Sequence, residues 1–187
     1  TAIEVVGLSL ALAFVIPMIC FYTNIAQISK GHENYKNIYS LCVDYVQVSS
    51  PGFGDFLKER VPEIDKVTSP ILNNGWYDIE NTNRKIHYVD KDFFYFFPAK
   101  FSKGDIDFLD TPNSIAVSKE FADYLAKSGP VIGREIDHNS NRYIVNAVFD
   151  EYGNNVLSGC DILMNNEAIR KSGHNDSIHS YRGSMTF

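Results

Sequence analysis

Residues 114–130 read SIAVSKEFADYLAKSGP and carry the clearest structural signal in the chain. The run SIAVS is short and apolar, which is typical of a strand, and Ser118 stands where it can cap a following helix. Glu120 lies in the predicted first turn, beside the positive end of the helix dipole. The helix would end before Gly129-Pro130 and bury a stripe of Phe121, Tyr124 and Leu125. This stretch therefore predicts a strand followed directly by an amphipathic helix.

The segments that follow predict more strands. Arg142–Phe149 (RYIVNAVF) is apolar on nearly both faces, which indicates a central strand. The polar link Asp137–Asn141 before it predicts a hairpin loop. Asp161–Met164 is a candidate for one further strand.

The segments that precede it predict a second helix and three strands. Ile38–Val48 alternates along its length and reads as one strand. Helical spacing predicts a short amphipathic helix at 53–61, ended by Pro62. Residues 64–71 and 84–89 look like strands. The order of these elements predicts an α+β fold, with a mixed sheet and helices packed on one face of it.

The chain begins with a long apolar run, and residues 5–29 contain no charged side chain. The most apolar part, Val5–Tyr22, would span about 27 Å as a helix, close to the hydrocarbon thickness of a bilayer. Membrane helices tolerate a proline such as Pro17. The alternatives are a signal peptide, a buried core helix and an amphipathic surface helix. We predict a transmembrane helix and its extension in residues 1–30, and an extramembrane domain in residues 31–187.

Composition restricts the function classes. The 187 residues suit one domain plus a small extra element. The net charge is −6, with 23 acidic against 17 basic residues, and this balance disfavours nucleic-acid binding. Cys20 lies in the apolar run, and no CxxC pair occurs that would suggest zinc or redox chemistry. Cys42 and Cys160 are either buried thiols or a disulfide, and the sequence leaves both open.

Motifs for catalysis or metal binding are missing from the sequence. There is no GxSxG, GxxxxGK[ST], HExxH or GxGxxG. His174, Asp176 and His179 lack helical zinc spacing and read as a solvated loop, and His138 reads as turn chemistry. The acid pairs Asp90/Asp92 and Asp105/Asp107 have no nucleophile or base nearby. We therefore predict no catalytic, cofactor-binding or metal residue, and no cofactor.

An aromatic block stands at 89–98, which reads VDKDFFYFFP. A single helical turn would place Phe93, Phe96 and Phe97 on one face. Buried phenylalanines add much apolar area to a core, and aspartates resist a hydrocarbon environment. Core packing is therefore favoured over lipid insertion.

These blocks, taken in order, resemble the MacB-like periplasmic core domain of FtsX-family ABC transporter permeases. Asp90–Phe94 is similar to the family's D-x-D-F-F block, and Pro112–Ala122 to its strand-to-helix block. Pro130–Ile136 matches a P-h-G-K-x-I turn, and Tyr143–Val148 matches a Y-x-V-x-G-V strand. The N-terminal run GLSLAL and the segment FGDFLKERVPEIDKVTS also fit, so the resemblance covers nearly the whole chain. Its departures are Arg134 for the usual Lys, Ala147 for the common Gly, and no Pro after Asp150.

The resemblance implies a mechanical role. A separate ABC ATPase subunit would hydrolyse ATP, and two permease chains, alike or different, would pair. Movement of the first helices would reach the periplasmic domains and serve export, lipoprotein extraction or activation of a partner. The resemblance places the chain in the bacterial inner membrane, with lipid around Val5–Tyr22 and most of the chain in the periplasm. It also implies a domain that continues beyond Phe187. The alternative is a single-span membrane-anchored sensor or ligand-binding domain; a membrane-anchored enzyme lacks motif support.

Overall fold

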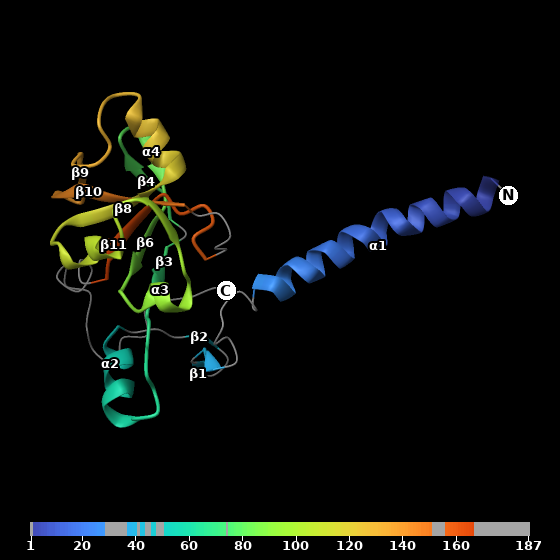
Figure 1. Ribbon diagram of the computed structural model, residues 1–187, viewed down its shortest axis with the longest axis horizontal. Coiled ribbons are helices and arrows are strands. Elements are labelled where there is room, and N and C mark those ends of the chain that lie inside the picture. Colours follow the sequence, from blue (N-terminus) through green and yellow to red (C-terminus); the bar gives the residue numbers. More distant parts are fainter. Residues whose placement is uncertain are drawn as a thin grey trace. The chain divides into compact units, whose positions relative to one another are not determined.

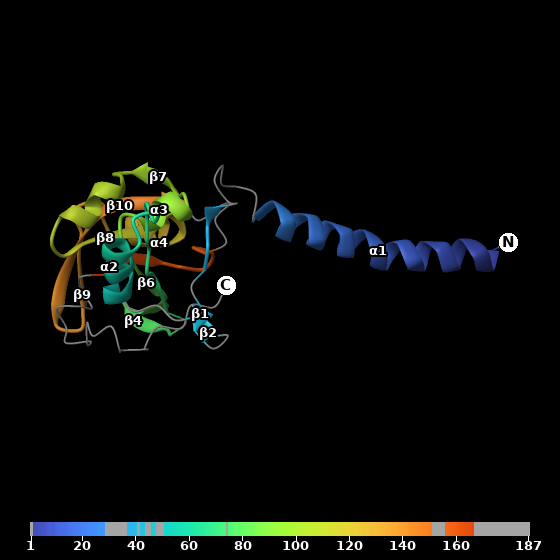
Figure 2. The ribbon, with the colours of Figure 1, turned by 90° about the horizontal axis from the view of Figure 1, so that it is seen from below.

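The structure is a computed structural model of the chain, and it describes residues 2–28, 37–40, 42–43, 46–47, 51–73, 75–150 and 156–166. The chain divides into two compact units, Thr1–Ile38 and Tyr39–Phe187, and each is described by itself. Figure 1 shows the ribbon with most helices and strands labelled, and Figure 2 shows it turned by 90°.

The N-terminal unit contains one long helix. Helix α1 runs over 27 residues, Ala2–Ile28, with Pro17 inside it. The structure describes the side chains of residues 7, 9, 11–20, 22 and 23 of this helix. Over the residues described, no helix combines the length and apolarity needed to cross a membrane. The span predicted at Val5–Tyr22 therefore stays a prediction.

The larger unit is built on a seven-stranded mixed sheet. Strands β6 and β11 are parallel, as are β8 and β10, and the other pairs are antiparallel. The spatial order is β3 (Ile71–Leu72), β6 (Ile86–Val89), β11 (Ile162–Asn165), β8 (Ser114–Ser118), β10 (Asn141–Asp150) and β7 (Lys100–Lys103), and β9 (Glu135–His138) also pairs with β10. The mixed sheet and the strand SIAVS are confirmed, and β10 is an interior strand with partners on both sides, β8 and β7.

Both faces of the sheet are covered. Ile115 and Val117 of β8 belong to one core cluster and Ala116 to the other, as alternation along a strand requires. Helix α4 (Lys119–Ala126) and the hairpin of β4 (Tyr77–Ile79) and β5 (Thr82–Arg84) contribute to the first cluster. The single-turn helix α3 (Phe93–Phe96) and the 3₁₀ helix η2 (Ile106–Asp110) contribute to the second. The prediction of helices on one face is wrong, because all five residues of β8 are buried and both sides need cover.

Local signals placed α4 and the hairpin correctly. The Ser118 hydroxyl oxygen accepts a hydrogen bond from the Phe121 N–H at 3.1 Å and so caps α4. The predicted hairpin loop is a two-residue turn at Asn139 and Ser140, both with positive φ. It is shorter than predicted because the strands continue to His138 and from Asn141.

Three segments near the start of the larger unit differ from their predictions. The strand predicted at 38–48 is instead an antiparallel pair, β1 (Cys42–Val43) and β2 (Val46–Gln47), because alternation alone does not reveal a chain reversal. Helix α2 (Pro51–Arg60) begins two residues before its predicted start, with proline at its first position. Residues 64–70 form no strand, and only Ile71 of the predicted strand pairs.

The aromatic block packs in the core, as predicted, although its buried face differs. Phe93 and Phe94 are buried, whereas Phe96 and Phe97 are half-buried. Phe94 is buried because β7 and η2 reach it, with ring centroids of Phe101 at 5.5 Å and Phe108 at 6.4 Å. The turn therefore buries two consecutive rings, and not the Phe93, Phe96 and Phe97 face.

His87 makes folding stability depend on pH. It is 5% exposed, and burial first, with the charge of Lys85, lowers its pKa below the ordinary 6.5. Below pH 6.5 the unfolded chain then binds more protons than the folded chain. We expect stability to be complete above pH 6.5 and to fall as the pH decreases.

Urea unfolding at pH 7.5 and at pH 5.5 measures this effect. The variant His87→Gln should show a smaller loss of stability at the lower pH than the natural chain. Part of the loss should remain, because burial also lowers the pKa of His138. An equal loss in both proteins would contradict the assignment to His87.

Candidate functional site

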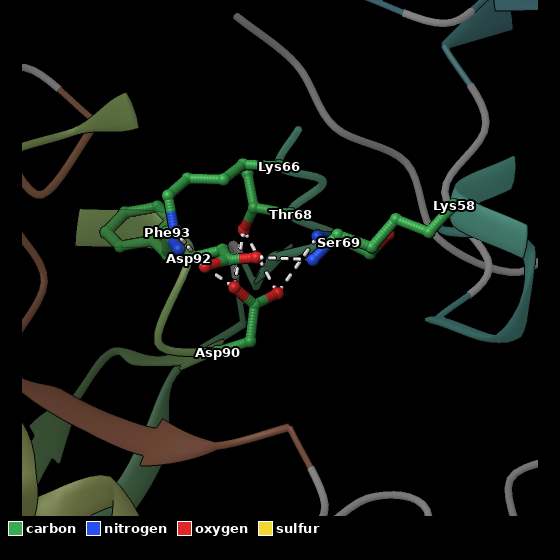
Figure 3. Close-up of polar contacts among 7 residues, drawn as sticks. All are labelled: Lys58, Lys66, Thr68, Ser69, Asp90, Asp92 and Phe93. Atoms are coloured by element: carbon green, nitrogen blue, oxygen red, sulfur yellow. Dashed lines mark hydrogen bonds and ion pairs between the residues drawn. The ribbon is translucent and has the colours of Figure 1, made fainter. Parts of the chain in front are cut away.

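Asp90 and Asp92 directly follow the buried strand β6, where they hold the segment that leads into the sheet. We call residues 64–70, which connect α2 to β3, the entering segment. Figure 3 shows the two carboxylates with their partners. The sequence singled out this acid pair but assigned it no contacts.

Asp90 joins the entering segment to the start of α3. Its carboxylate accepts hydrogen bonds from the Thr68 hydroxyl at 2.9 and 3.0 Å and from the Ser69 N–H at 3.0 Å. It also accepts one from the Phe93 N–H at 2.8 Å. One side chain thus fixes the end of β6, the beginning of α3 and the last part of the entering segment.

The electrostatics of Asp90 are those of a structural acceptor. Burial raises the pKa of the carboxyl, and the hydrogen bonds from Ser69, Thr68 and Phe93 oppose that rise. Both oxygens already accept from groups of the protein. A role as a general base would require these bonds to break, so the arrangement favours anchoring over catalysis.

Asp92 makes a second, more exposed attachment. It forms ion pairs with Lys58 of α2 at 3.0 Å and with Lys66 of the entering segment at 3.1 Å. Burial raises the pKa of Asp92, but the two ammonium groups outweigh it and hold the pKa below its usual value. The Lys66 ammonium also lies 5.2 Å from the centre of the Tyr95 ring. We use the name aspartate clamp for Asp90 and Asp92 together with the residues that contact their carboxylates, which are Lys58, Lys66, Thr68, Ser69 and Phe93.

The other acid pair is also structural. The Asp105 carboxylate accepts from the Asp107 N–H at 2.9 Å and begins η2. Lys91 lies 3.7 Å from Asp107 and also contacts Asp110. These exposed contacts attach η2 to the turn before α3.

The histidines do not form a metal centre in the part of the chain that the structure describes, where no group of three or more potential ligands occurs. His138 is buried at the end of β9, edge-on to Tyr77 with ring centroids 5.0 Å apart, so its interpretation as a turn residue is wrong. His174, Asp176 and His179 lie outside the described residues. The prediction that no residue is catalytic or binds a metal or cofactor stays a prediction.

The structure also leaves open whether Cys42 and Cys160 are thiols or form a disulfide. Cys160 is buried in the second core cluster, with its sulfur 3.3 Å from the Ile162 carbonyl oxygen. The side chain of Cys42 lies outside what the structure describes.

Sequence reasoning missed the partners in the clamp. Lys58, Lys66, Thr68 and Ser69 lie more than twenty residues before the aspartates that they contact. The available signal was a D-x-D pair directly after a buried strand, together with a polar segment, 64–70, that does not alternate cleanly.

Two solved structures share the fold of this chain, and a third is less similar. A domain of a putative permease from Porphyromonas gingivalis is 15% identical with a TM-score of 0.54, over 74% of this chain and 64% of that one. The periplasmic region of MacB from Actinobacillus actinomycetemcomitans is 12% identical with a TM-score of 0.54, over 73% and 62%. The extracellular domain of the noncanonic ABC-type transporter YknZ from Gram-positive bacteria is 14% identical with a TM-score of 0.48, over 74% and 76%.

The present chain spans less than two thirds of the first two of these structures. No curated protein matches it. The family model of the MacB-like periplasmic core domain matches residues 1–181, nearly the whole chain. The chain therefore belongs to the MacB-like periplasmic core domain family, as its sequence blocks predicted.

Proposed function

We propose that the chain is the extracytoplasmic domain of an ABC transporter permease, together with the first membrane helix of that permease. It couples ATP hydrolysis by a separate ATPase subunit to movement in the periplasm. That movement serves export, lipoprotein extraction or activation of a partner protein. Two permease chains, identical or different, work as a pair.

The observation that carries this proposal is the aspartate clamp, seen in a chain of this family. Movement that arrives through the N-terminal segments reaches the sheet through the entering segment, which runs into β3 and is fixed by the clamp to the end of β6. Buried hydrogen bonds to a carboxylate resist such displacement better than exposed ion pairs do. Asp90 supplies partly buried hydrogen bonds, and Asp92 adds two ion pairs that extend the attachment to α2.

The same proposal assigns residues 1–30 to the membrane helix with its extension and 31–187 to the periplasmic domain. A helix as long as α1 extends about 40 Å, which exceeds the hydrocarbon thickness of a bilayer. The side chains of Phe14, Met18 and Tyr22 are each more than 70% exposed and suit contact with lipid. The helix lies in the inner membrane, with lipid around Val5–Tyr22.

The test is purification of the full-length protein from crosslinked native membranes, with identification of the proteins that accompany it. We expect an ABC ATPase in a fixed ratio to the permease. A tagged single-span protein of the same membrane, purified in parallel, controls for abundant contaminants. Recovery of a signalling kinase or a small ligand without any ATPase would favour the single-span sensor and overturn the proposal.

A further inference from the structure

Two neighbouring parallel strands end side by side with a polar residue after each. In the pairing of β6 with β11, Val89 lies opposite Asn165. The Asn166 N–H then donates to the Val89 carbonyl oxygen at 3.0 Å. Asp90 and Asn166 are therefore equivalent positions at the same end of the sheet.

Both side chains hold the backbone of Ser69. The Ser69 N–H donates to Asp90 at 3.0 Å, and the Ser69 carbonyl oxygen accepts from the Asn166 amide nitrogen at 2.8 Å. Ser69 is 9% exposed and Asn166 is 6% exposed, so solvent competes little for these bonds. One residue of the entering segment is thereby fixed from two strands at once.

The two strands lie inside the sheet. Strand β6 lies between β3 and β11, and β11 lies between β6 and β8. A displacement of Ser69 is therefore transmitted to two adjacent interior strands. Without the Asn166 contact, Asp90 would connect Ser69 to the end of β6 alone.

The Asn166 amide is only half used for hydrogen bonding. Its oxygen is buried and accepts no hydrogen bond from the described residues. The contact that the structure shows for this side chain is the hydrogen bond from its amide nitrogen to the Ser69 carbonyl oxygen.

We propose that Asn166 is a positioning residue, which makes Ser69 a two-sided joint between the entering segment and the strands β6 and β11. Movement of the entering segment then displaces both strands together. This inference rests on the proposed function, in which ATP hydrolysis by the partner subunit moves the N-terminal segments.

The test measures amide hydrogen exchange in the full-length permease purified with its native ATPase. The complex is compared without nucleotide and with ATP plus vanadate. In the natural protein we expect the exchange of residues 61–70 and of residues 156–166 to change. In Asn166→Ala the change at 156–166 should be at least threefold smaller, while the change at 61–70 remains.

Asn165→Ala is the matched control. Asn165 stands at the end of the same strand, and its amide nitrogen donates to the Leu109 carbonyl oxygen at 2.7 Å, towards η2 and not towards the entering segment. This variant should keep the natural exchange pattern. Asn166→Ser, whose side chain is too short to reach Ser69, replaces Asn166→Ala if the latter does not assemble.

Two results would overturn the inference while leaving the proposed function in place. In the first, the Asn166 variants show the same nucleotide-dependent change of exchange at residues 156–166 as the natural protein. The other is an equal reduction in the Asn165 and Asn166 variants, which would indicate general loosening of the strand end. If the natural complex contains no ATPase or shows no nucleotide-dependent change, the proposed function itself fails and the inference fails with it.

Discussion

Replacing Asp90 by alanine should lower the free energy of unfolding by about 1–3 kcal/mol, because it removes the acceptor of the buried Ser69 N–H and of the half-buried Thr68 hydroxyl. The Ser69 N–H, the Phe93 N–H and the Thr68 hydroxyl all donate to this carboxylate. The Phe93 N–H also donates to the Asp90 carbonyl oxygen at 3.2 Å, and alanine retains that acceptor. Burial raises the pKa of Asp90, so the loss arises from unpaired donors more than from lost charge. Urea unfolding at pH 7.5 measures the difference.

Asp92→Ala and Asp90→Asn complete this comparison. Asp92 contacts two lysine side chains that are 41% and 35% exposed, so its loss should cost no more than about 1 kcal/mol. Asp90→Asn keeps one acceptor oxygen and should fall between the two alanine variants. Equal effects of Asp90→Ala and Asp92→Ala would show that the buried bonds of the clamp matter no more than its exposed ion pairs.

The sequence predicted best where the signals are local. Ser118, Phe121 and Leu125 lie within eight residues, and the strand, the cap and the helix stripe all agree there. The mixed sheet was predicted from such local segments, and the family was predicted from the order of the sequence blocks. The number of covered faces was predicted wrongly, although SIAVS, buried at all five positions, contains no polar alternation that would indicate a solvent face.

The clamp could not be predicted because its contacts are distant in the chain. Lys58 and Asp92 are 34 residues apart, and no local pattern pairs them. The neighbouring contact of Ser69 with Asn166 spans 97 residues. Asp90 appeared as a charged residue beside a loop, which is most often solvated. In the structure the entering segment lies against the ends of β6 and β11, and this contact partly buries Asp90.

Replacing Gly104 by alanine should cost about 3 kcal/mol or more, because the position combines an unfavourable backbone with no space. Gly104 has φ +64°, a conformation that L residues with a side chain adopt at a cost. An added Cβ would lie 2.4 Å from the Asn146 carbonyl oxygen and 2.9 Å from the Ala147 Cβ. Both contacts involve β10, which pairs with the strand β7 that ends just before the glycine, so relief would require the two strands to separate.

Gly159→Ala separates the two causes. Gly159 has φ +71°, but an added Cβ meets nothing within 4 Å, so only the backbone cost of about 1 kcal/mol should appear. Thermal unfolding should therefore show a decrease in Tm of roughly 6–12 °C for Gly104→Ala and a much smaller one for Gly159→Ala. Similar decreases would mean that β7 and β10 move apart easily. The edge strand β7 would then separate from the sheet at little cost in free energy. Strands β6 and β11, which contact the entering segment, each have a paired strand on both sides.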